Sequence, residues 1–210
     1  DLFPDRLASS RGNLVKHDES RVDVPESRQF VGFDAFQGVI GTDCDIVILA
    51  TPPGFRPQHF EAAVAGGKHV FMEKPVAVDP VGARSIMTSA KKAEGVGLCV
   101  VTGTQRRHQR DYVATYQQIK AGAIGKVKEV HSFSDKQWGD LAPVPQKADP
   151  IPDTFAWDLW LGPAEERPFL NGYYHPGNWR KRRDFGTGTL GDMGCHMFSG
   201  WYRAMDLTSP

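Results

Sequence analysis

The chain has 210 residues, of which 40% are hydrophobic and 24% charged, a balance typical of a folded globular protein. Lys and Arg together number 25, as do Asp and Glu, so the chain lacks the basic excess usual in nucleic-acid-binding proteins, and we expect no nucleic-acid partner. No apolar run reaches the roughly 18–20 residues that a membrane-spanning helix needs, so we expect no membrane partner.

The first elements predicted along the chain are a helix, a short strand and a second helix. Pro4 to Lys16 has a proline in its first turn and apolar residues on one side, which predicts a helix. Residues 17–28 are charged and irregular, and we interpret them as a surface loop. A short strand is expected over Arg28–Phe33, followed by a helix that Asp34 caps and Gly41 ends.

A parallel sheet is predicted in the middle of the chain. The run Asp45–Ala50 is continuously apolar after its first residue, which indicates a strand buried on both faces. Two more strands follow it, each after a helix; in chain order these elements are Pro57–Ala65, His69–Met72, Asp79–Glu94 and Gly97–Val101. Regular alternation of strand and helix predicts a parallel α/β sheet, whose ligands bind beyond the carboxyl ends of its strands.

The pattern changes after Arg110, and we place a domain boundary near Gln109, giving domains 1–109 and 110–210. A helix is expected over Asp111–Ala121, and the alternating segment Lys126–Phe133 predicts a strand with one solvated face. Residues 139–153 are proline-rich and read as a loop, and a final helix is expected from Thr189 to Leu207.

Glu73-Lys74-Pro75 follows directly on the second strand of the predicted sheet. A lysine beside an acid at this edge can polarise a substrate oxygen or place a cofactor. The same tripeptide is also compatible with an ordinary surface pair before a loop proline, so the residues alone leave both interpretations open.

A second candidate lies in the glycine-rich segment 186–196. Asp192 and His196 are four residues apart, so on a helix they share one face. A carboxylate beside an imidazole raises its basicity and fixes its orientation, as a base that takes a proton from a hydroxyl requires. A capped helix start with a core histidine, or half of a metal site, would give the same pair. We expect no metal, because no third ligand stands at a diagnostic spacing.

Aromatic and arginine side chains are dense between residues 154 and 184, including Trp157, Trp160, Trp179 and Arg180. Aromatic faces pack against sugar C–H surfaces and arginine binds hydroxyls, yet the packing of a small core explains such a stretch equally well. The G-x-G-x-x-G turn of dinucleotide folds is absent, since Gly186-Thr-Gly188 does not follow a strand in a βαβ unit.

Taken together, the motifs resemble those of the Gfo/Idh/MocA oxidoreductase family. The matching segments are Val47–Pro53, Phe60–Pro75, Gly103–Arg107, Trp160–Pro163 and Gly186–His196. The resemblance implies an α/β fold, with a partial Rossmann parallel sheet that binds NAD(P) followed by the start of an α/β domain with an open mixed sheet. Because the family's glycine-rich turn lies upstream of the position that matches Asp1, we expect this sequence to be a fragment that lacks the first βαβ unit.

The resemblance also implies roles for single residues. Lys74, Asp192 and His196 match the catalytic positions of the family, with His196 as the proton-transfer residue. Those that match the cofactor-binding positions are Asp1, Thr51, Pro52, Glu73 and Lys74. Asp1 falls where an acidic residue binds the adenosine ribose hydroxyls, which favours NAD over NADP. We expect substrate contacts from Arg106, Trp179 and Arg180.

The activity expected from this resemblance is hydride transfer between a nicotinamide cofactor and a sugar or polyol hydroxyl. Two alternatives stay open: an NAD-dependent glycoside hydrolase that works by transient oxidation and elimination, and an inactive sugar-binding protein. The expected partner is a small carbohydrate, with self-association into a homo-oligomer in the full-length protein. The sequence predicts no particular compartment.

Overall fold

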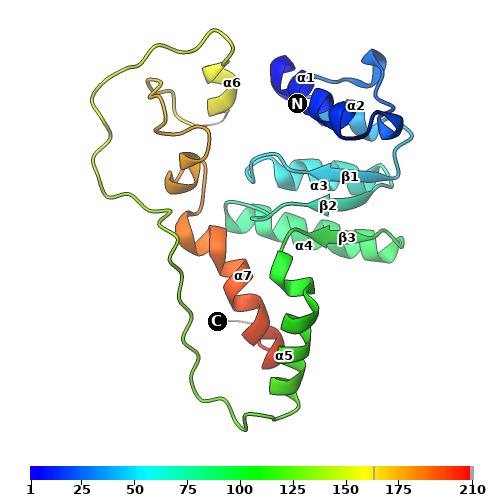
Figure 1. Ribbon diagram of the computed structural model, residues 1–210, viewed down its shortest axis with the longest axis vertical. Helices are drawn as coiled ribbons and strands as arrows, with labels where there is room; N and C mark the ends of the chain where they lie inside the picture. The colour runs from blue at the N-terminus through cyan, green and yellow to red at the C-terminus, as the bar shows by residue number, and fades with distance from the viewer. Residues whose placement is uncertain (163, 209–210) are drawn as a thin grey trace.

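The computed structural model of the chain describes residues 1–162 and 164–208, and its centre is a three-stranded parallel sheet (Figure 1). The strands are β1 (Ile46–Leu49), β2 (His69–Met72) and β3 (Val100–Thr102), in the order β1-β2-β3. Val47 pairs with Val70, which pairs in turn with Val100. All three carboxyl ends therefore meet at one edge, as the sequence predicts for a parallel α/β sheet.

Helices connect and flank the sheet. The α-helices are α1 (Pro4–Asp18), α2 (Ala35–Ile40), α3 (Arg56–Ala65), α4 (Pro80–Gly95), α5 (Arg110–Lys120), α6 (Trp157–Leu161) and α7 (Gly188–Ala204). Short 3-10 helices cover Glu19–Arg21, Glu26–Arg28, Gln105–His108 (η3) and Asn178–Lys181 (η4). The predicted start of α4 is confirmed, because the Asp79 carboxylate accepts a hydrogen bond of 2.7 Å from the Gly82 N–H. Asp34 does not cap α2 with its side chain, since its backbone (φ −89°, ψ 1°) is not extended as a capping residue requires.

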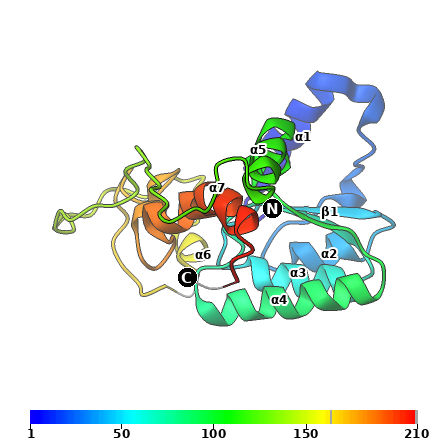
Figure 2. The same cartoon turned by 90° about the horizontal axis from the view of Figure 1, so that it is seen from below.

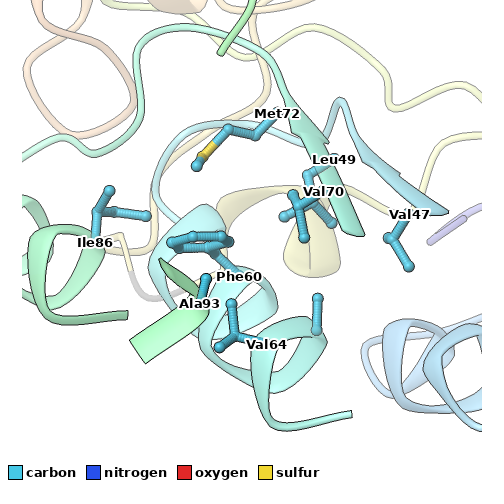
Figure 3. Close-up of a cluster of buried hydrophobic side chains, with 9 residues drawn as sticks. Val47, Leu49, Phe60, Val64, Val70, Met72, Ile86 and Ala93 are labelled. Carbon is cyan, nitrogen blue, oxygen red and sulfur yellow. The ribbon is translucent and has the colours of Figure 1, made fainter. Parts of the chain in front are cut away.

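The main core lies between one face of the sheet and the pair of helices α3 and α4 (Figures 2 and 3). Its largest member, Phe60, is fully buried between side chains from β1, β2 and α4. Burial of a side chain of this size stabilises the fold by roughly 1.5–3 kcal/mol. The strand β1 buries only this face: Ile46 and Ile48, which point the other way, are 61% and 70% exposed. The expectation of burial on both faces was therefore wrong for this strand.

Neither of the two other predicted strands forms. At Arg28–Phe33, the backbone bonds to another segment among the described residues are those of Phe30 and Gly32 with Asp1. Residues 126–133 make no backbone hydrogen bond to another segment in the described part of the chain; their contact is a side-chain bond, from the Trp201 Nε1–H to the Ser132 hydroxyl at 3.1 Å. A strand needs a partner for its backbone groups, which an alternating pattern cannot supply. Beyond β3 the described residues contain no strand, so they do not include the mixed sheet expected after residue 110.

The second half of the chain packs by helices and aromatic side chains. Helices α5 and α7 lie side by side (Figure 1), and their contact is close: a Cβ on Gly200 would come 2.4 Å from the Tyr112 hydroxyl oxygen. A separate aromatic core surrounds α6, with Trp157, Leu161, Phe169, Leu170 and Tyr174 buried. Within the described residues, no helix is both long and apolar enough to cross a membrane. The amino-terminal half of α7 faces the carboxyl edge of the sheet.

Candidate active site

Lys74 and Asp192 form the central contact of the candidate site. Glu73 extends β2 by one hydrogen bond, from its N–H to the carbonyl of Leu49 at 2.9 Å, so Lys74 leaves the sheet at its carboxyl edge. The Lys74 Nζ donates to the Asp192 main-chain oxygen at 2.8 Å and to its Oδ1 at 3.0 Å. The two side chains are only 18% and 9% exposed. Residues 118 positions apart thus meet as a shielded ion pair.

His196 lies on α7 one turn beyond Asp192, and both residues are buried. Burial lowers the pKa of His196 below its ordinary value of 6.5; Lys74 and Arg106 lower it further, while Asp192 and Glu73 oppose the shift. The sequence analysis expected Asp192 to raise the basicity of His196, but burial and the nearby cations outweigh the carboxylate. The lowered pKa favours the neutral imidazole, which is the form that can accept a proton.

Arg180 is the second cation at Asp192. Its Nε lies 3.3 Å from Asp192 Oδ1, and its guanidinium stacks on the Trp179 ring at 4.4 Å and lies 5.4 Å from the Trp138 ring. The backbone approach here is tight, because a Cβ on Gly186 would come 2.7 Å from the Arg180 Cα. The predicted residues Trp179 and Arg180 therefore belong to the same site as Lys74 and Asp192.

Arg106 approaches the site from η3, which packs against α7. Its side chain is exposed, and its charge is one of those that lower the pKa of His196. Trp157 and Trp160, by contrast, belong to the aromatic core around α6, so the packing interpretation holds for them. Pro163, which ends one of the motif segments, lies outside the described residues.

Two functional candidates escaped sequence reasoning, Arg56 and Gly103. The Arg56 side chain is 1% exposed and donates to the carbonyls of Thr51 and Pro75, so it joins the turns after β1 and β2. Burial lowers the pKa of Arg56 to about 10, and the charge of Glu73 opposes the shift. Gly103 admits Glu73, since a Cβ there would come 2.7 Å from Glu73 Oε2. No periodicity or motif marks Arg56, and the motif segment Gly103–Arg107 gives no sign that its glycine makes room for Glu73.

Of the five residues expected to bind a dinucleotide cofactor, four lie at the carboxyl edge of the sheet and one does not. Thr51 and Pro52 are exposed directly after β1, and Glu73 and Lys74 follow the neighbouring strand. Asp1 makes its contacts elsewhere, with Phe3 and with the backbone of Phe30 and Gly32. The strand-end set lies together at the carboxyl edge of the sheet, and its role in cofactor binding, like that of Asp1, stays a prediction. In the described residues, no three His, Cys, Asp or Glu side chains gather as metal ligands would.

The parallel sheet and the site at its carboxyl edge define a class of protein, an α/β protein with a sheet of the Rossmann type. Two family models match the chain in succession: the oxidoreductase-family NAD-binding Rossmann fold over residues 11–102, and the oxidoreductase-family C-terminal alpha/beta domain over residues 126–203. The chain belongs to the Gfo/Idh/MocA oxidoreductase family. The proposed boundary near Gln109 falls between the two matches and stays a prediction.

Individual relatives agree with this family. An inositol 2-dehydrogenase of Rhodococcus erythropolis is 32% identical over 119 residues, 57% of this chain and 33% of that protein. A scyllo-inositol 2-dehydrogenase (NADP(+)) of Bacillus subtilis is 22% identical over 192 residues, 91% of this chain and 41% of its own length. The chain thus spans between a third and a half of these curated relatives. An oxidoreductase domain protein from Kribbella flavida shares the fold, with a TM-score of 0.56 and 22% identity over 81% of this chain and 38% of that one.

Proposed function

We propose that the protein oxidises a secondary hydroxyl of a sugar or polyol, with NAD as the partner of the reaction. The observation that carries the proposal is the contact of Lys74 with Asp192 one helical turn from a buried His196 with a lowered pKa, at the carboxyl edge of a parallel sheet. Relatives named inositol 2-dehydrogenase support a cyclic polyol or sugar as the substrate class.

His196 acts as the general base in this proposal. Its imidazole accepts the hydroxyl proton as the C–H bond breaks. A general base has to be deprotonated at the working pH, and the lowered pKa of His196 favours that form. Lys74 donates to the developing oxyanion: an ammonium has three N–H donors, of which two are directed at Asp192. Asp192 holds the Lys74 ammonium in place through its main-chain and carboxylate oxygens.

NAD, when bound, supplies the acceptor for the hydride. Thr51, Pro52, Glu73 and Lys74 would contact its nicotinamide end, because they line the exposed turns after β1 and β2. Asp1 would accept from the adenosine ribose hydroxyls and repel the 2′-phosphate of NADP, which favours NAD. We further propose, from the family resemblance alone, that the protein is a homo-oligomer, for which light scattering would give a mass above that of one chain.

An NADH-formation assay on the protein that carries this chain tests the proposal. With myo-inositol, scyllo-inositol, a panel of aldoses and the uronates and phosphates of these sugars, we expect NADH to accumulate with at least one substrate. Lys74→Met should reduce kcat/KM about 10²–10³-fold, as the loss of an oxyanion donor does. Lys91→Met, a matched change of an exposed lysine on α4, should have no effect. Release of free sugar without net NADH, or normal turnover in Lys74→Met, would contradict the proposal.

A further inference from the structure

The charges around the reaction centre are unbalanced. The charge of Glu73 acts on Arg56 as well as on His196. Counting both carboxylates, the described residues at the centre carry four cations, Arg56, Lys74, Arg106 and Arg180, against Glu73 and Asp192. Lys74 and Arg180 already share Oδ1 of the Asp192 carboxylate, at 3.0 Å and 3.3 Å. A site with this excess of positive charge favours a ligand that brings negative charge.

Two of these cations retain free hydrogen-bond donors. The Arg180 guanidinium directs Nε to Asp192 and Nη1 to the carbonyl of Gly177, and stacking on Trp179 fixes its plane. Within residues 1–162 and 164–208, its Nη2 has no acceptor, and the exposed Arg106 side chain makes no ion pair or hydrogen bond. A guanidinium presents N–H groups in a fork that matches carboxylate or phosphate oxygens.

The proposed reaction moves positive charge within the site without adding to it. When His196 accepts the hydroxyl proton beside Lys74 and Arg106, the hydride that leaves the carbon neutralises the nicotinamide cation, so the excess of positive charge persists throughout the reaction. The oxidised nicotinamide ring is itself a cation, so the bound cofactor adds to the excess at this end. An anion carried by the substrate would offset these charges and stabilise the imidazolium as it forms.

We propose, on the basis of the function proposed above, that the substrate carries an anionic group, a carboxylate or a phosphate, bound by the free donors of Arg106 and Arg180 while its hydroxyl faces His196. The substrate class is therefore a sugar acid or a phosphorylated polyol rather than a neutral sugar. Arg106 and Arg180 then act as specificity-determining residues, because they select for the anion without taking part in the proton transfer.

Calorimetric titration tests the inference independently of turnover. D-glucose and D-galactose are each compared with their uronates and their 6-phosphates, on the NAD-saturated protein that carries this chain. We expect at least one anionic form to bind about tenfold or more tightly than the neutral sugar, the strength typical of a charge-assisted hydrogen bond. The uronate and phosphate arms identify which anion the guanidinium groups prefer. Raising the salt concentration to 1 M should reduce the preference, because the Debye length falls to about 3 Å.

Variants separate specificity from general damage. Arg106→Gln should remove most of the preference for the anion, measured as the ratio of the affinities for the anionic and the neutral sugar. Arg107→Gln, the matched change at the next position of η3, should keep the preference, because Arg107 is not among the charges that act on His196. The inference would be overturned if the anions bind no more tightly than the neutral sugars, or if they do not bind at all. A preference that Arg106→Gln leaves intact would overturn it as well.

The two proposals fail in different ways. A protein that binds anionic sugars but forms no NADH with any of them would overturn the dehydrogenase proposal and leave the anion site supported. A protein that forms NADH equally well from neutral and anionic sugars would support the dehydrogenase and overturn the anion site.

Discussion

At the scale of single residues, His196 combines burial with nearby cations, and both disfavour its charged form. Its proposed role as a base predicts that His196→Asn lowers kcat about 10²–10⁴-fold, the usual contribution of general acid–base catalysis, with little change in KM. His131→Asn is the matched control, since the side chain of His131 is 65% exposed and lies outside the site. Retention of kcat in His196→Asn would remove the histidine from the mechanism.

The same residue predicts the pH dependence of the reaction. Because the pKa of His196 is lowered from 6.5, the acidic limb of kcat/KM should have its midpoint below pH 6.5. Arg106→Gln removes one of the cations that lower this pKa, so the midpoint should move upward. Proton NMR titration of the imidazole gives the same pKa without turnover. A midpoint above 6.5 in the unmodified protein, or a downward shift in the variant, would contradict the assignment.

That pKa also links His196 to stability. The unfolded chain binds the imidazole proton more readily than the native state, so the native state should lose free energy of unfolding as the pH falls below 6.5.

At the scale of the elements, Arg56 holds two turns together from the start of α3. Arg56→Met would leave the carbonyls of Thr51 and Pro75 without their donor, and we expect the free energy of unfolding to fall by about 3 kcal/mol. Arg56→Lys, which keeps the charge and one donor, should lose less. Urea denaturation followed by circular dichroism measures both values. Equal stability of Arg56→Met and the unmodified protein would show that the guanidinium does not hold these turns.

The close approach of Gly186 to η4 gives a second prediction for the elements. Gly186→Ala would place its Cβ 2.7 Å from the Arg180 Cα and 2.8 Å from the Arg180 carbonyl oxygen, so the backbone of η4 has to move. We expect a loss of about 1–3 kcal/mol in the free energy of unfolding, as in other overpacked sites. Gly95→Ala is the control, because a Cβ there meets nothing within 4 Å. Unchanged thermal unfolding of Gly186→Ala would refute this packing argument.

At the scale of the whole molecule, the elements that were predicted correctly are those that local sequence patterns determine. The strand His69–Met72 was predicted at its exact bounds, and the predicted start of α4 and the helix that carries Asp192 and His196 were confirmed. The three elements share one physical cause, because hydrophobic periodicity and breaker residues lie within each segment.

Other features depend on partners distant in the chain, and sequence reasoning failed there. Residues 126–133 have the alternation of a strand but no backbone hydrogen-bond partner in the described structure, and one face of β1 is exposed where burial was expected. Arg56 was missed because the carbonyls it binds lie 5 and 19 residues away, in two different turns. The meeting of Lys74 with Asp192 was expected only through the family resemblance, since no local pattern joins residues 118 positions apart.

A double-mutant cycle tests most directly whether Lys74 and His196 serve one reaction centre. The values of kcat/KM for Lys74→Met, His196→Asn and the double variant are compared with that of the unmodified protein, in NADH formation from its best polyol substrate. If both residues act on the same reacting carbon and oxygen, the double variant should be about as slow as the slower single variant. Losses that multiply in the double variant would show that the two residues act independently, and would contradict a shared centre.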